Sequence, residues 1–95
     1  MIKYLEKEED FNDIIKNSII VDFYADWCGP CKMMGSVLEE ITEFDVLKVN
    51  VDDFPNIATK YGVMSIPTLI KFNNGEEQKK LIGFKTKEEL LEEFK

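Results

Sequence analysis

The chain lacks histidine, contains only two cysteines, and has no run of about 18 apolar residues, the length that a membrane-spanning helix needs. Its start, MIKYLEKEEDF, is charged where a signal peptide would be apolar. We therefore expect a cytoplasmic protein with no membrane contact. A single chain with two cysteines and no histidine also cannot supply the roughly four ligands of a structural zinc site, so no metal is expected.

Basic residues are in deficit as well. Twelve Lys and Arg residues stand against nineteen Asp and Glu residues, which gives a formal net charge of −7. Such a chain repels a phosphate backbone, so we do not expect nucleic acid as a partner. The acidic stretches EKEED and EELLEEFK are interpreted as solvated helix surface.

No internal repeat, low-complexity tract or linker-like segment interrupts the 95 residues. A hydrophobic fraction of 44% is sufficient for one core, whereas a second domain would not fit into this length. We expect residues 1–95 to form a single, monomeric domain.

The hydrophobic pattern alternates between strand and helix signals. The run IIVDFYA is almost continuously apolar, which is typical of a central strand buried on both faces. After it, apolar residues recur every three or four positions, which predicts a helix from Cys28 to Phe44. The remaining expected elements are a short strand near 2–5, a helix over 8–17, a strand over 46–52, a helix over 55–62, a hairpin of 67–72 with 76–83, and a last helix that carries Leu90, Leu91 and Phe94. This order predicts an α/β fold with a central mixed sheet of four to five strands and about four flanking helices.

Both cysteines stand in the segment ADWCGPCK, three positions apart, and three interpretations are open. A structural disulfide is disfavoured, because a cross-link that closes so short a loop contributes little stability. Half of a metal site would need a second chain to complete it. In a reducing cytosol a close pair is more often catalytic or metal-binding than structural, so a redox pair is the favoured interpretation.

The two thiols are expected to have different roles. If Cys28 caps the predicted helix and Pro30 lies in its first turn, the Cys28 sulfur sits among unpaired N–H groups at the positive end of the dipole. A thiolate is stabilised there, which makes Cys28 the candidate nucleophile. Cys31 would face inward within reach of Cys28, which makes it the candidate resolving thiol.

Resolution needs a proton acceptor, and Asp22 is the one charged residue within the run IIVDFYA. Its neighbours in the run are apolar on both faces of the expected strand, so we expect the carboxylate to be buried rather than exposed on an edge strand. Burial would raise its pKa and suit it to accept the proton of Cys31.

The segment VDFYADWCGPCK resembles the active-site segment of thioredoxins, in particular small bacterial ones with a WCGPC motif. KVNVDDFPNIATKYGVMSIPTLIKFNNGE resembles their central strand and cis-proline loop, and IGFKTKEELLEEF their closing strand and helix. The resemblance covers nearly the whole chain and implies a thioredoxin fold and reduction of protein disulfides.

The resemblance also implies roles for individual residues. It supports Cys28, Cys31 and Asp22 in the roles above and makes Lys48 the basic neighbour of Asp22. Further residues implied to shape the motif or the substrate groove are Trp27, Gly29, Pro30, Ile66, Pro67, Gly83 and Phe84, with Pro67 following a cis peptide bond.

Some residues depart from the family pattern. Ser36, preceded by Gly35, stands where thioredoxins usually carry a proline in the active-site helix, and Tyr24 stands where many have tryptophan. The connection TEFDVLK is also shorter than usual, and Ser65 replaces a common glycine. These differences could alter potential or partner choice but do not touch the sulfur chemistry directly.

The expected function is therefore that of a disulfide reductant recycled by a thioredoxin-type flavoprotein reductase, whose electron source is undecided between nicotinamide and ferredoxin. Its partners would be client protein disulfides, and no bound cofactor is expected. The Gly-Pro pair favours a reductant, because related oxidants and isomerases usually place a histidine there. The alternatives are a dedicated oxidant, isomerase or narrow-target carrier, and a non-enzymatic metal-binding or disulfide-stapled binding module.

Overall fold

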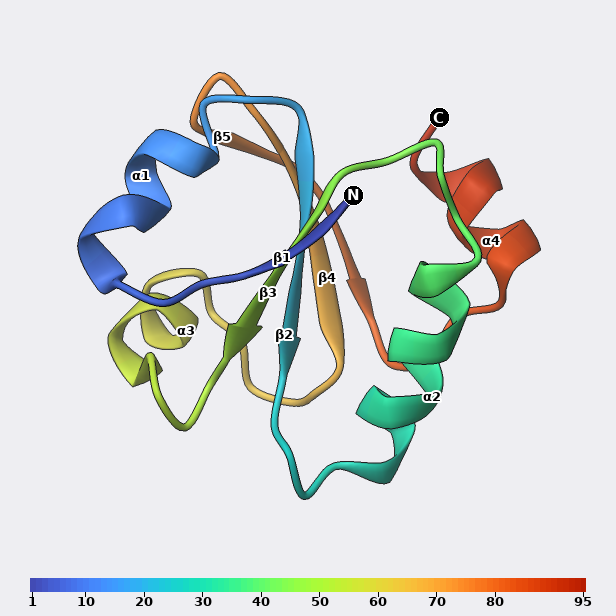
Figure 1. The fold of residues 1–95 in the computed structure, drawn as a ribbon, viewed down its shortest axis with the longest axis horizontal. Coiled ribbons are helices and arrows are strands. Elements are labelled where there is room, and N and C mark those ends of the chain that lie inside the picture. Colours follow the sequence, from blue (N-terminus) through green and yellow to red (C-terminus); the bar gives the residue numbers. More distant parts are fainter.

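The computed structural model describes residues 1–95 and has a five-stranded sheet at its centre (Figure 1). The strand order is β1-β3-β2-β4-β5. β1 and β2 pair in parallel with β3, whereas β4 is antiparallel to both β2 and β5, so the sheet is mixed as predicted. The strands are β1 (Ile2–Tyr4), β2 (Ile19–Tyr24), β3 (Val46–Asn50), β4 (Thr68–Asn73) and β5 (Glu76–Ile82).

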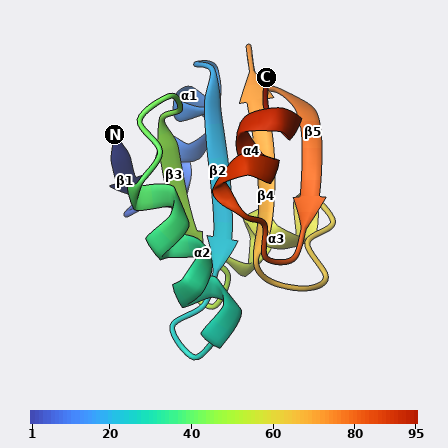
Figure 2. The ribbon, with the colours of Figure 1, turned by 90° about the vertical axis from the view of Figure 1, so that its right-hand side faces the viewer.

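Helices cover both faces of the sheet. In Figure 1, α1 and α3 lie on one side, while α2 and α4 lie on the other. Figure 2 shows α2 and α4 in front of the sheet. None of the helices has the length and hydropathy needed to cross a bilayer. The helices are a one-turn 3-10 helix η1 (Glu8–Asp10), α1 (Phe11–Ile14), α2 (Gly29–Glu39), α3 (Pro55–Lys60) and α4 (Lys87–Glu93).

Side chains that alternate along β2 fill two separate cores. Val21 and Phe23 pack in one cluster with residues of α1 and α3, whereas Ile20 packs in the other with residues of α2 and α4. Successive side chains of a strand point to opposite faces, so Asp22 lies on the same face as Ile20, beneath α2. β2 is buried along nearly its whole length, as its continuous apolar pattern predicted.

The helix predicted from Cys28 to Phe44 is too long, because α2 ends at Glu39. The last N–H groups, of Glu40 and Ile41, bond three residues back to Val37 and Leu38, which tightens and closes the final turn. Ile41 and Phe44 are nonetheless packed into the core from the connecting turn, Phe44 edge-on against Phe94. Apolar spacing therefore persisted beyond the helix, because the loop itself contributes core side chains.

Three other elements are shorter than predicted, among them the helix expected over 55–62, which ends at Lys60. The helix expected over 8–17 is η1 followed by the four residues of α1. The strand expected over 46–52 ends at Asn50, whose side-chain oxygen accepts hydrogen bonds from the N–H groups of Asp52 and Asp53, at 2.9 and 3.4 Å. This local turn competes with the sheet for the backbone and ends the strand.

The predicted hairpin is present and joins β4 to β5 through Asn74 and Gly75. Both residues have positive φ, 56° and 80°. This is the backbone of a type I′ turn, for which Asn-Gly is the favoured sequence.

A capping box at the start of α4 should make a measurable contribution to stability. The Thr86 hydroxyl accepts a hydrogen bond from the Glu89 N–H at 3.2 Å, and the Glu89 carboxylate accepts one from the Thr86 N–H at 3.0 Å. Thr86→Ala is expected to lower the free energy of unfolding by about 1 kcal/mol in urea titrations. Thr42→Ala, in an exposed loop, is the matched control. Equal stability of the two variants would contradict the contribution of the cap.

Candidate active site

The two cysteines lie at the junction between β2 and α2. Cys28 is the N-cap of α2, and its Sγ accepts a hydrogen bond from the Cys31 N–H at 3.2 Å. The two sulfurs are joined as a disulfide, with 5.2 Å between the Cα atoms. The predicted capping position is thus confirmed, and in the reduced state the same N–H would face a thiolate on Cys28. A donor and a helix N-terminus at that sulfur favour its anionic form.

Gly29 and Pro30 explain why the helix begins where it does. They are the first two residues of α2, where a proline fits because its missing N–H would have no partner within the helix. Both are exposed, whereas Cys31 is buried. Because α2 is anchored through Met34 and Leu38, which are fully buried, the cysteines are held on a rigid element.

Asp22 and Lys48 form an ion pair beneath α2. They are direct neighbours in the pairing of β2 with β3, and Lys48 Nζ lies 3.4 Å from Asp22 Oδ2. Asp22 is fully buried, and neither of its carboxylate oxygens accepts a hydrogen bond. Burial raises the pKa of Asp22 from its ordinary 3.8 to about 6, and the Lys48 ammonium opposes part of that rise. The expected burial of Asp22 is confirmed.

A loop ahead of β4 lies against the cysteines. The Ile66–Pro67 peptide bond is cis, as the resemblance implied, and the Ile66 carbonyl oxygen lies 3.9 Å from Cys28 Sγ. The Thr68 hydroxyl donates to the Ser65 carbonyl at 2.8 Å, and the Gly83 N–H donates to the Pro67 carbonyl at 2.8 Å. These bonds fix the loop from both sides.

A groove of about 520 Å³ opens beside Cys28. Trp27 forms part of it while 71% exposed, and its indole N–H donates to Asp52 at 2.9 Å, which holds the ring in place. Most of the lining is apolar. The lining residues are Trp27, Cys28, Gly29, Pro30, Val51, Val63, Met64, Ser65 and Ile66.

The structure brings four of the seven predicted motif and groove residues together, because Trp27, Gly29, Pro30 and Ile66 line the groove. Pro67, Gly83 and Phe84 do not line it, although the Gly83 N–H donates to the Pro67 carbonyl. Sequence reasoning overlooked Val63 and Met64. Their position just before Ser-Ile-Pro was the available signal, because residues next to a loop that touches the cysteines lie near them too.

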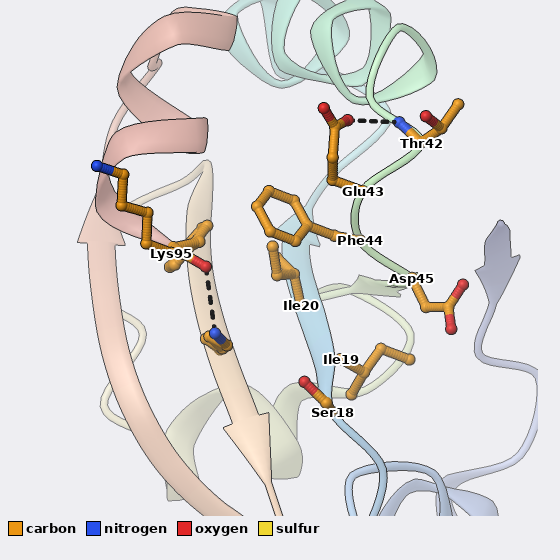
Figure 3. Close-up of a pocket in the computed structure, with 10 residues that line it drawn as sticks. Ser18, Ile19, Ile20, Thr42, Glu43, Phe44, Asp45 and Lys95 are labelled. Atoms are coloured by element: carbon orange, nitrogen blue, oxygen red, sulfur yellow. Dashed lines mark hydrogen bonds between the residues drawn. The ribbon is translucent and has the colours of Figure 1, made fainter.

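A second hollow, of about 550 Å³, lies at the other end of β2, near its first residues (Figure 3). Figure 3 shows Phe44 and Ile20 within it and charged residues of both signs around it, among them the acidic Glu43 and Asp45 and the basic Lys95. It contains no cysteine. The structure gathers no group of three or more His, Cys, Asp or Glu side chains able to hold a metal ion.

Comparison with known proteins gives consistent results. The family model described as Thioredoxin matches residues 2–95. A thioredoxin of Staphylococcus epidermidis is 50% identical over 91 residues, which cover 90% of this chain and 88% of the relative. One from Staphylococcus aureus is 47% identical with the same coverage.

Solved structures agree in fold. A mutant thioredoxin from Halobacterium salinarum superposes with a TM-score of 0.89 at 35% identity, over 98% of this chain and 87% of the other. The thioredoxin NaTrxh from Nicotiana alata superposes with a TM-score of 0.85 at 30% identity, over 97% and 88% of the two chains.

Proposed function

Since the chain belongs to the thioredoxin family, we propose that Cys28 is its attacking thiol and Cys31 its resolving thiol. The protein is a protein-disulfide oxidoreductase that reduces disulfides by thiol–disulfide exchange. The assignment of the two thiols rests on one observation above all: the Cys31 N–H donates to Cys28 Sγ at the start of α2. The donor and the helix terminus stabilise negative charge on Cys28, the sulfur that must attack.

The exchange proceeds in two displacements. The Cys28 thiolate attacks one sulfur of a client disulfide, so that a mixed disulfide forms and the second client sulfur leaves as a thiolate. Cys31, after losing its proton, then attacks Cys28 Sγ and releases the first client sulfur. The client gains two electrons, and the Cys28–Cys31 pair becomes oxidised.

Asp22 is the proposed acceptor of the Cys31 proton, with Lys48 as its charged neighbour. Its position supports this role, because it lies on the face of the sheet that α2 covers. A pKa near 6 keeps the carboxylate mostly ionised at neutral pH while leaving it more basic than an exposed aspartate.

Clients are proposed to bind in the apolar groove next to Cys28, where an extended segment would meet the backbone before Pro67. Trp27 and Ile66 would contact it, with Gly83 and Phe84 at the outer margin. We further propose that the chain acts in the cytoplasm as a single monomeric domain and is reduced again by a flavoprotein thioredoxin reductase. Membership of the thioredoxin family supports the proposal that a thioredoxin reductase is the partner that reduces it.

The reduction potential of the Cys28–Cys31 pair tests the direction of electron flow. Equilibration in dithiol buffers, followed by Trp27 fluorescence, should give a value at or below the cytosolic glutathione poise, about −220 to −260 mV by extraction methods. A value near −180 to about −120 mV would instead indicate an oxidant or isomerase. Turnover with a flavoprotein reductase and its electron donor then tests the proposed recycling.

Met64 offers a test of the groove. It is 96% exposed at the groove margin, so a client that binds there should bury it. Met64→Glu is expected to lower kcat/KM for an apolar protein client by about five- to tenfold, because burial of a large apolar side chain is lost. Reduction of a small aromatic disulfide should hardly change.

Met33→Glu is the matched control, since Met33 is also exposed but lies on α2 outside the groove. Equal losses in the two variants would indicate a general effect of charge and count against client binding at this site.

A further inference from the structure

The Lys48 ammonium is surrounded by more than its carboxylate partner. Its Nζ lies 4.7 Å from the centre of the Tyr24 ring and 5.7 Å from that of Tyr4. Both distances fall within the range of cation–π attraction, about 6 Å. The two rings also meet edge-on, with 6.2 Å between their centres. The ammonium therefore has aromatic neighbours on β1 and β2 as well as Asp22.

The fourth side of this environment is formed by α2. A Cβ atom added at Gly35 would lie 3.1 Å from Lys48 Nζ, closer than ordinary van der Waals contact. The helix backbone thus passes close to the ammonium, and glycine leaves the necessary room. Lys48 is nearly buried, at 9% exposed, so its charge is held within a confined space.

Confinement matters because the ammonium ends a flexible four-carbon stem, so its single carboxylate partner leaves Nζ other positions to occupy. An attraction to the two rings would favour the position in which Nζ lies 3.4 Å from Asp22 Oδ2. Burial, then the charge of Asp26, raises the pKa of Tyr24 above its ordinary 10.0, so its ring stays a neutral phenol where Asp22 titrates.

We propose that Tyr24, assisted by Tyr4 and the open space at Gly35, is a positioning residue that holds the Lys48 ammonium beside the Asp22 carboxylate. We name this arrangement the lysine socket. Its relevance to turnover rests on the proposed role of Asp22 as proton acceptor, but the socket itself is a property of the folded protein.

The charged groups near the socket come from several elements. Lys48 on β3 faces Asp22 and Tyr24 on β2 and Tyr4 on β1. Asp26 and Asp53, in the loops after β2 and β3, act on Tyr24. From α2, the uncharged Gly35 approaches Lys48.

The test is the titration of the Asp22 carboxyl carbon by NMR in the oxidised protein. Tyr24→Leu removes the ring face and is expected to raise the pKa of Asp22 by about 0.5 to 1 unit, because a less ordered ammonium stabilises the carboxylate less. Tyr24→Phe keeps the ring and should leave the pKa at the wild-type value. Since Tyr24 is only partly buried, both variants should fold.

Repeating the Tyr24→Leu titration in a Lys48→Met variant distinguishes an effect on the ammonium from a general loss of packing. In Lys48→Met protein, Tyr24→Leu should no longer shift the pKa of Asp22, because there is no ammonium left to position. A shift that persists there, an equal shift in the phenylalanine variant, or no shift in the leucine variant would overturn the proposal.

These outcomes are independent of the catalytic role of Asp22. If Asp22→Asn leaves the resolution of mixed disulfides unchanged, the proton-acceptor proposal fails, while the titration still decides the socket. If Asp22 is the proton acceptor and the socket positions Lys48, Tyr24→Leu should also shift the pH profile of the resolution step to higher pH, by the same amount as the pKa of Asp22.

Discussion

Replacing Cys31 with serine is expected to convert the protein into a trap for its clients. Cys28 would still attack a client disulfide, but the serine hydroxyl is too weak a nucleophile to displace the client from the mixed disulfide. Steady-state reduction should fall by on the order of a thousandfold or more, as when other enzymes lose a nucleophile. Covalent adducts should accumulate on non-reducing gels and disappear with dithiothreitol.

Cys28→Ser is the matched variant, because it removes the other sulfur of the same pair. It should lose turnover to a similar extent but form almost no adducts, since Cys31 does not line the groove that Cys28 lines and lacks the N–H donor that Cys28 has. Equal trapping by the two variants would refute the assignment of attacking and resolving thiols. Both should be compared at the same client concentration and pH.

Asp22→Asn is expected to change how stability depends on pH. The pKa of Asp22 is about 6 in the folded protein against an ordinary 3.8, so between about pH 4 and 6 the folded state holds a proton that the unfolded state has released. The contribution of this group to stability is therefore greatest below pH 4 and is lost as pH rises through 6. Two pKa units correspond to about 3 kcal/mol.

Asparagine does not titrate, so the variant should gain stability relative to the wild type as pH rises. Its free energy of unfolding, minus that of the wild type, should increase by about 2.5 kcal/mol from pH 4 to pH 8 in urea titrations. Lys48 loses its partner in the variant at every pH. This loss adds a constant to the difference in the free energy of unfolding and does not change how that difference depends on pH. A difference that stays constant with pH would contradict the raised pKa.

The same variant should slow the second chemical step. The rate of release from the mixed disulfide is expected to fall more than the rate of the initial attack, because in the proposed mechanism Asp22 accepts a proton only from the Cys31 thiol. In the wild type the release rate should rise with pH through about 6, and this rise should be lost in the variant. Asp26→Asn, an exposed neighbour in sequence, controls for loss of one negative charge.

Much of the fold and site could be predicted because the signals are local. The continuous apolar pattern around Asp22 predicted a central buried strand, and Cys28 before Gly-Pro predicted a helix cap. Lys48 and Pro67 were different, since only the resemblance to a known family singled them out. Nothing in the local sequence states that Lys48 lies beside Asp22, because that depends on the register between β2 and β3.

Helix ends and the groove were harder to predict. Phe44 continues the apolar spacing of α2 but packs against Phe94 from a loop, so periodicity alone placed the end of the helix too late. Met64 belongs to the groove because its loop folds back against Cys28, whereas the segment that carries Phe84 does not reach the groove lining. Such contacts join segments that are distant in sequence.

The sequence by itself determined the order of the elements, the helix cap at Cys28 and the burial of Asp22, because propensity, capping and hydrophobic pattern act over a few residues. Tertiary structure alone decided which groups meet. The approach of Tyr24 and Gly35 to Lys48 requires two strands and a helix in one particular packing. These contacts depend on how side chains from different layers of the fold pack against one another, and no local sequence pattern encodes that packing.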